Sequence, residues 1–107
     1  MNKELLIDMS GFLDEETFHE YVSKKLNFPG YYGYNLNEFW DCIMDDEQSS
    51  MPQKLIVEGL ASFRRFLPKL HDGFIECLQD YAKEYPDRIV VFRQDSPSGK
   101  GIEFENE

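Results

Sequence analysis

The sequence has few cysteines and no long apolar run. Cys42 and Cys77 are the only two thiols in 107 residues, and both lie within apolar helical patterns. Two cysteines placed in this way fit reduced thiols in the cytoplasm better than the disulfide framework of a small secreted domain. No stretch approaches the ~18 apolar residues of a membrane-spanning helix, and the N-terminal apolar run is too short for a secretion signal. We therefore expect a soluble cytoplasmic protein without a membrane partner.

Positive charge is also scarce. Eleven Lys and Arg residues stand against 21 Asp and Glu residues, which gives a formal net charge of −10. This balance argues against nucleic acid as a ligand, because neutralising phosphates requires clustered cations. It favours a cationic protein partner, because opposite charges speed encounter. Taken alone, the acidity is better explained by solubility than by a cationic partner.

One part of the chain lacks cations altogether. No Lys, Arg or His occurs from Leu26 to Gln53, whereas this stretch contains five carboxylates: Glu38, Asp41, Asp45, Asp46 and Glu47. Its first part, Leu26–Met44, begins with a Pro–Gly turn and continues through a tyrosine-rich loop into a predicted helix. We call Leu26–Met44 the loop–helix segment.

The helix prediction in this segment depends on residue spacing. Asn35 is a favourable N-cap, and Glu38 is placed to reach back to its backbone N–H. The apolar residues recur at i, i+3, i+4 and i+7, namely Leu36, Phe39, Trp40 and Ile43. The opposite side carries Asn37, Asp41 and Asp45, four residues apart, which we expect to face solvent.

The rest of the chain predicts three strands and three further helices. The strands are expected at Leu5–Ile7, Lys54–Gly59 and Arg88–Arg93, and the helices after the cap Asp14, over Leu60–Phe66, and from Pro68 to the stop at Pro86. Since crossovers between parallel strands are right-handed, strand order 1-2-3 places every helix on one face. The predicted fold is a single α/β domain over 1–107, with two layers and a three-stranded parallel sheet. Residues 94–107 are expected to stay mobile or to add an edge strand.

Several details of this fold can be predicted. We expect the first strand to be buried and the third to lie inside the sheet, because it has four consecutive apolar residues. In the short third helix, Phe63 and Phe66 should face inward. Gly73 weakens the last helix by about 1 kcal/mol relative to Ala, so it should mark a kink or a junction.

The chemistry of the chain does not favour an enzyme. Cys42 is expected to be a small buried hydrophobe, since a nucleophilic thiol requires a cationic neighbour or a helix N-terminus. His19 and His71 lie in ordinary helical patterns. The acidic group matches no calcium-binding loop, and no glycine-rich phosphate loop is present. We therefore expect no catalytic, metal or cofactor-binding residues. An enzyme that uses Cys42 or the acidic cluster remains the alternative.

The loop–helix segment resembles the barstar family, small intracellular inhibitors of barnase-type ribonucleases. The pattern that carries the resemblance is Pro29, Tyr31-Tyr32-Gly33, Asn35-Leu36 and Trp40-Asp41-Cys42. The resemblance implies that the segment occupies the ribonuclease active site and that Asp41 mimics an RNA phosphate. It also implies that Tyr31 lies against the catalytic histidine of the nuclease. The two-layer fold, and a protein that is monomeric when free, follow from the same resemblance.

The predicted partner-binding surface combines this resemblance with the acidic residues of the last helix. Its members are Tyr31, Gly33, Tyr34, Asn35, Leu36, Asn37, Trp40, Asp41, Asp45, Asp80 and Glu84. Asn37 and Tyr34 replace carboxylates of the best-known barstar, and Asp45 and Asp46 add acids after the helix. The alternative to a ribonuclease partner is another basic protein bound by the same scaffold.

Overall fold

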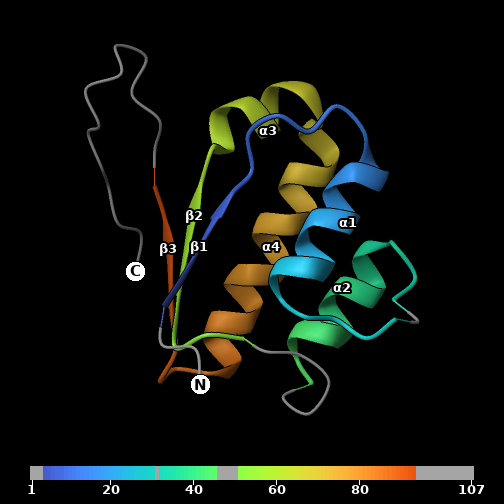
Figure 1. The fold of residues 1–107 in the computed structure, drawn as a ribbon. Helices are drawn as coiled ribbons and strands as arrows, with labels where there is room; N and C mark the ends of the chain where they lie inside the picture. The colour runs from blue at the N-terminus through green and yellow to red at the C-terminus, as the bar shows by residue number, and fades with distance from the viewer. Residues whose placement is uncertain (1–3, 31, 46–50, 94–107) are drawn as a thin grey trace.

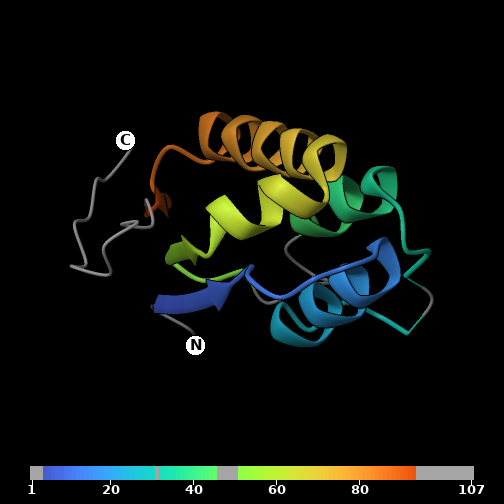
Figure 2. The same cartoon turned by 90° about the horizontal axis from the view of Figure 1, so that it is seen from above.

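Three parallel strands form the sheet, in the predicted order β1-β2-β3. The computed structural model describes residues 4–30, 32–45 and 51–93. The elements are β1 (Glu4–Asp8), α1 (Glu15–Lys25), α2 (Leu36–Ile43), β2 (Lys54–Glu58), α3 (Leu60–Phe66), α4 (Pro68–Glu84) and β3 (Ile89–Phe92). The four helices all lie on one face of the sheet (Figures 1 and 2). This confirms the two-layer α/β fold.

The core lies between the sheet and the helices. Ile7 of β1 pairs with Val57, and Val57 with Phe92, so these three side chains form one row across the helix-covered face. Above them Phe18 of α1 stacks on Phe63 of α3, with ring centroids 5.3 Å apart. Each fully buried side chain of this size stabilises the fold by about 1.5–3 kcal/mol. The helices are therefore fixed to the sheet mainly by aromatic packing.

The helices begin and end where the sequence predicts. The carboxylate of Asp14 accepts a hydrogen bond from the Thr17 backbone N–H at 2.8 Å, which caps α1. Pro68 occupies the first turn of α4, where its missing N–H costs nothing, and Pro86 follows the C-terminal end. Within the described residues, no helix is long and apolar enough to span a membrane.

Gly73 marks the junction between α2 and α4. A Cβ atom built at this position would collide with Cδ1 of Leu36 in α2. The absent side chain thus allows the two helices to approach closely. The predicted junction is confirmed. It lies at Leu36, the first residue of α2.

Two details of the prediction are wrong. Phe66 is 52% exposed, because it lies 60° around the helix from Phe63, which fills the core position. Leu6 of β1 is 42% exposed, since it alternates with the core residue Ile7 and so points away from the helices. In the described sheet β3 pairs only with β2, and its Ile89 is 50% exposed. The predicted fourth strand falls on residues 94–107, outside the described residues.

Candidate functional site: the loop and helix α2

Asn35 joins the loop to α2. Its Oδ1 accepts a hydrogen bond from the Glu38 backbone N–H at 2.8 Å, and its Nδ2 donates to the Gly33 carbonyl at 3.2 Å. One side chain therefore satisfies an N–H at the helix start and fixes the turn before it. The predicted N-cap is confirmed. Gly33 and Asn35, both predicted partner-binding residues, are exposed at this junction.

The two faces of α2 differ as the spacing predicts. Phe39 and Ile43 are completely buried, whereas Leu36 and Trp40 are half-buried. The opposite face exposes three polar side chains, Asn37, Asp41 and Asp45. A helix held by a packed apolar face can present polar groups in fixed positions on the other.

Asp41 is the central carboxylate of this exposed face. Its side chain points away from the core, and none of the described Lys, Arg or His residues forms a salt bridge with it. An Asp41 buried or paired to a cation of its own chain would have ruled out a role in binding a cationic partner. The geometry leaves that role open to it.

The loop before α2 rests on aromatic packing. Tyr32 is buried, and its ring lies 4.9 Å from that of Phe28. Tyr34 is exposed, adopts a positive φ of 53°, and stacks its ring on His19 at 5.8 Å. Tyr32 is therefore a core residue and Tyr34 a surface residue of the same loop. Tyr31, a predicted contact residue, lies outside the described residues.

His19 supports this loop from below and is the residue that sequence reasoning missed. It is only 1% exposed, and its Nδ1 lies 2.6 Å from the hydroxyl of Tyr32. Its Nε2 is buried without a hydrogen-bond partner among the described residues. Burial lowers the pKa of His19 to about 4 and raises the pKa of Tyr32. The imidazole is therefore neutral at physiological pH. The only sequence signal for the burial of His19 is its position one helical turn before Val22, on the apolar face of α1.

The thiols are not activated. Burial, together with the neighbouring carboxylates Glu38, Asp41 and Asp45, raises the pKa of Cys42. Burial and the charges of Glu76 and Asp80 raise the pKa of Cys77. A thiol whose pKa is raised is a poor nucleophile.

The described acidic residues do not gather into a metal site. Among the described residues, no group of three or more His, Cys, Asp or Glu side chains is arranged to hold a metal ion. Asp46 and Glu47, part of the acidic cluster in the sequence, fall outside those residues.

Asp80 and Glu84 extend the acidic surface onto α4. They follow Gly73 by seven and eleven residues, so all three lie on one stripe of the helix. Gly73 contacts α2, and both carboxylates are exposed. The stripe therefore places them on the side of α4 that faces α2.

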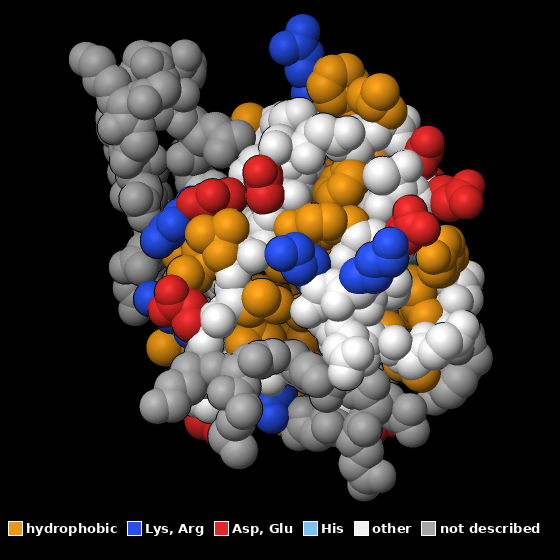
Figure 3. All heavy atoms as spheres, in the orientation of Figure 1, with side chains coloured by type: hydrophobic (Ala, Val, Ile, Leu, Met, Phe, Trp, Pro, Cys, Tyr) orange, Lys and Arg blue, Asp and Glu red, His pale blue; other side chains and the backbone are white. Residues whose placement is uncertain are grey.

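The face shown in Figure 3 carries scattered Lys and Arg side chains between carboxylates, with no continuous positive patch.

The fold and this surface define a two-layer α/β domain that presents an acidic, aromatic helix supported by a packed core. Residues 2–96 match the family model Barstar, described as "Barstar (barnase inhibitor)". The chain therefore belongs to the Barstar family. It is 29% identical over 89 residues to a protein of Bacillus subtilis (strain 168) named "Putative ribonuclease inhibitor YrdF". That alignment covers 83% of this chain and 96% of the relative.

Proposed function

We propose that this protein inhibits a barnase-type ribonuclease by occupying its active site with the loop–helix segment. The observation that carries the proposal is the position of Asp41, an exposed carboxylate at the centre of a supported helix. Membership of the Barstar family and the relative named as a ribonuclease inhibitor support the same function. We further propose that the protein acts as a monomer in the cytoplasm of the cell that makes the nuclease.

The mechanism is mimicry of an RNA phosphate. A ribonuclease binds the phosphodiester with cationic donors, and a carboxylate placed among them accepts charge-assisted hydrogen bonds. Asp41 would supply this carboxylate from a helix whose inner face is already packed. Little additional ordering would then be needed on association, which preserves affinity.

The neighbouring residues would complete the contact. Tyr34 and Trp40 offer rings at the loop and on α2, and aromatic side chains dominate the centres of protein interfaces. By the family resemblance, Tyr31 would lie against the catalytic histidine of the nuclease. Asn37, which lies one helical turn before Asp41, would also contact the nuclease.

Asp45, Asp80 and Glu84 would act mainly at longer range. Exposed carboxylates around an interface raise the association rate with a cationic partner, and salt weakens this effect. We therefore expect the association rate to fall as the salt concentration rises, while the dissociation rate changes little.

The test is inhibition of RNA cleavage by a barnase-type ribonuclease. Asp41→Ala should weaken inhibition by about 30-fold to several thousand-fold, as expected for about 2–5 kcal/mol lost from a buried, hydrogen-bonded charge pair. The matched control is Glu4→Ala, which removes an exposed carboxylate from β1 with the same change of net charge. The control should inhibit almost as well as the unchanged protein.

Two results would contradict different parts of the proposal. An absence of inhibition by the unchanged protein at micromolar concentration would refute the ribonuclease partner. Equal inhibition by Asp41→Ala and the unchanged protein would refute phosphate mimicry but leave the inhibitor function intact.

A further inference from the structure

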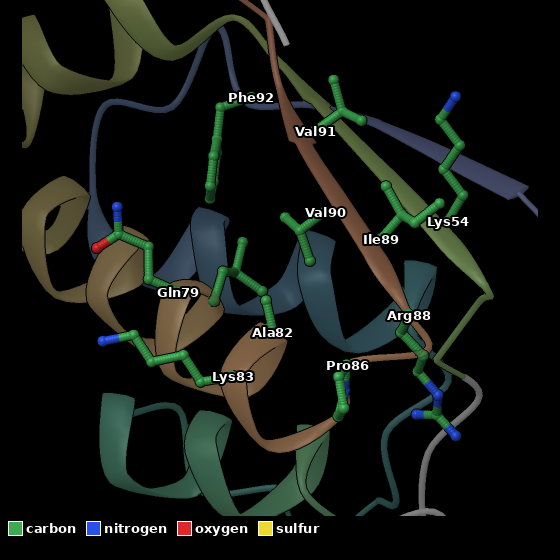
Figure 4. A pocket seen from close by; sticks show the side chains of 11 residues that line it. Lys54, Gln79, Ala82, Lys83, Pro86, Arg88, Ile89, Val90, Val91 and Phe92 are labelled. Carbon is green, nitrogen blue, oxygen red and sulfur yellow. The ribbon is translucent and has the colours of Figure 1, made fainter. Parts of the chain in front are cut away.

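A groove runs along the outer edge of the sheet, between β3 and α4. Its volume is about 850 Å³, and Figure 4 shows its side chains. It is lined by Lys54, Leu78, Gln79, Ala82, Lys83, Pro86, Arg88, Ile89, Val90, Val91 and Phe92. Among the described residues, the lining contains three cations and no carboxylate, although the chain as a whole carries a net charge of −10. Such a groove suits an extended segment with apolar and acidic side chains.

The backbone of β3 has hydrogen-bonding groups directed at this edge. The N–H groups of Ile89 and Arg93 donate to the carbonyls of Gln53 and Val57, each at 2.9 Å, and so face β2. Because alternate residues of a strand point to opposite sides, the N–H and C=O groups of Val90 and Phe92 face the open edge. In the described sheet β3 pairs only with β2. An open strand edge is a template for another strand.

The sequence that follows β3 fits this edge. Residues 94–107 start where β3 ends, and they include the reversal signal Ser96-Pro97-Ser98-Gly99. After it, Ile102 and Phe104 alternate with Glu103 and Glu105. We propose that residues 102–105 form a fourth strand antiparallel to β3, with Ile102 opposite Phe92 and Phe104 opposite Val90.

The proposed register follows from the two faces of the strand. Directly opposite residues in an antiparallel pair share a face, and Val90 and Phe92 point to the helix-covered face. Ile102 and Phe104 would then enter the apolar part of the groove, above Ala82. Shifting the register by one residue would place Glu103 and Glu105 there instead.

Charge favours the same direction of the chain. The segment 94–107 contains four carboxylates and one lysine, and three of the carboxylates follow residue 102. An antiparallel return brings this acidic end towards Ile89, near which Lys54 and Arg88 line the groove (Figure 4). The strand would close the edge against pairing with a second copy of the chain. This inference does not depend on the proposed ribonuclease inhibition.

Amide hydrogen exchange of the full chain, followed by NMR at dilute concentration, tests the proposal. The amides of Val90 and Phe92 should exchange within about tenfold of the rate of Val91, which faces β2 in either case. The proposal is overturned if Val90 and Phe92 exchange like an unstructured chain while Val91 stays protected. It is equally overturned if their protection appears only at concentrations where sedimentation detects a dimer, since a second copy would then cover the edge.

A double variant identifies the segment responsible. Ile102→Ser with Phe104→Ser should speed exchange at Val90 and Phe92 by about tenfold or more and leave Val91 unchanged. Glu107→Gln, in the same segment but beyond the paired residues, is the control and should change none of the three rates. Unchanged protection in the double variant would refute the proposed pairing.

Discussion

Acidification should destabilise this protein through a single buried histidine. His19 is 1% exposed, contacts Tyr32 through Nδ1, and has no hydrogen-bond partner for Nε2 among the described residues. Burial lowers the pKa of His19 from 6.5 to about 4. The unfolded chain therefore binds a proton more readily than the folded protein between these two pH values, and protonation favours unfolding.

The magnitude follows from the size of the pKa shift. The stabilisation by neutral His19 is fully present above pH 6.5 and decreases as the pH falls towards 4, below which it no longer changes. The whole shift corresponds to a loss of about 3 kcal/mol in the free energy of unfolding. Of this, about 2 kcal/mol is lost between pH 7.5 and pH 5, before most carboxylates are protonated.

Urea unfolding between pH 7.5 and pH 5 measures this loss. The unchanged protein should lose about 2 kcal/mol over this range, whereas His19→Gln, which keeps a polar group near Tyr32 but cannot be protonated, should lose little. His71→Gln, which replaces the other histidine, is the matched control and should behave like the unchanged protein. Parallel pH profiles for the unchanged protein and His19→Gln would refute the reasoning.

Two further predictions concern the supports of α2. Asn35→Ala should lower the free energy of unfolding by about 1 kcal/mol, measured by urea unfolding, because it removes the N-cap of α2; an unchanged stability would show that the cap is dispensable. Gly73→Ala should gain up to about 1 kcal/mol from helix propensity but lose about 1–3 kcal/mol by overpacking against Leu36. In a Leu36→Ala background the same substitution should stabilise, so a double-mutant cycle should show coupling of about 1 kcal/mol or more. Additive effects would contradict the close contact between α2 and α4.

The sequence predicts the architecture well because its local signals agree with one another. The residue types at the helix ends fit only those positions. Asp14 and Asn35 cap the starts of α1 and α2, Pro68 lies in the first turn of α4, and Pro86 follows its end. The apolar runs of β2 and β3 and the right-handed crossover rule then leave little freedom for the topology.

The errors arise where burial depends on tertiary context. Phe66 and Phe63 are both aromatic and three residues apart, and only the placement of α3 over the sheet decides which one is buried. Leu6 and Ile7 are neighbouring apolar residues of β1, and only the side on which the helices pack decides which one is buried.

The candidate site shows the same division. The spacing of α2 correctly predicts that Asn37 and Asp41 are exposed, because helix periodicity alone determines it. His19 was missed because a histidine in an amphipathic helix gives no signal of the tyrosine loop that covers it. That loop is distant in sequence and reaches His19 only through the tertiary fold.

Apart from Leu36, the supports of Asp41 lie outside the surface that it would use for binding. Phe39 and Ile43 fix α2 from its buried side, the Gly73–Leu36 contact fixes it against α4, and His19 holds the loop through Tyr32. Exposed residues such as Asn37 and Tyr34 can therefore differ from those of a relative without moving the helix. Partner choice would then depend on the exposed side chains, while the position of the central carboxylate would depend on the core. A variant that loosens the core should weaken binding to every partner alike, whereas a change at Asn37 should discriminate between partners.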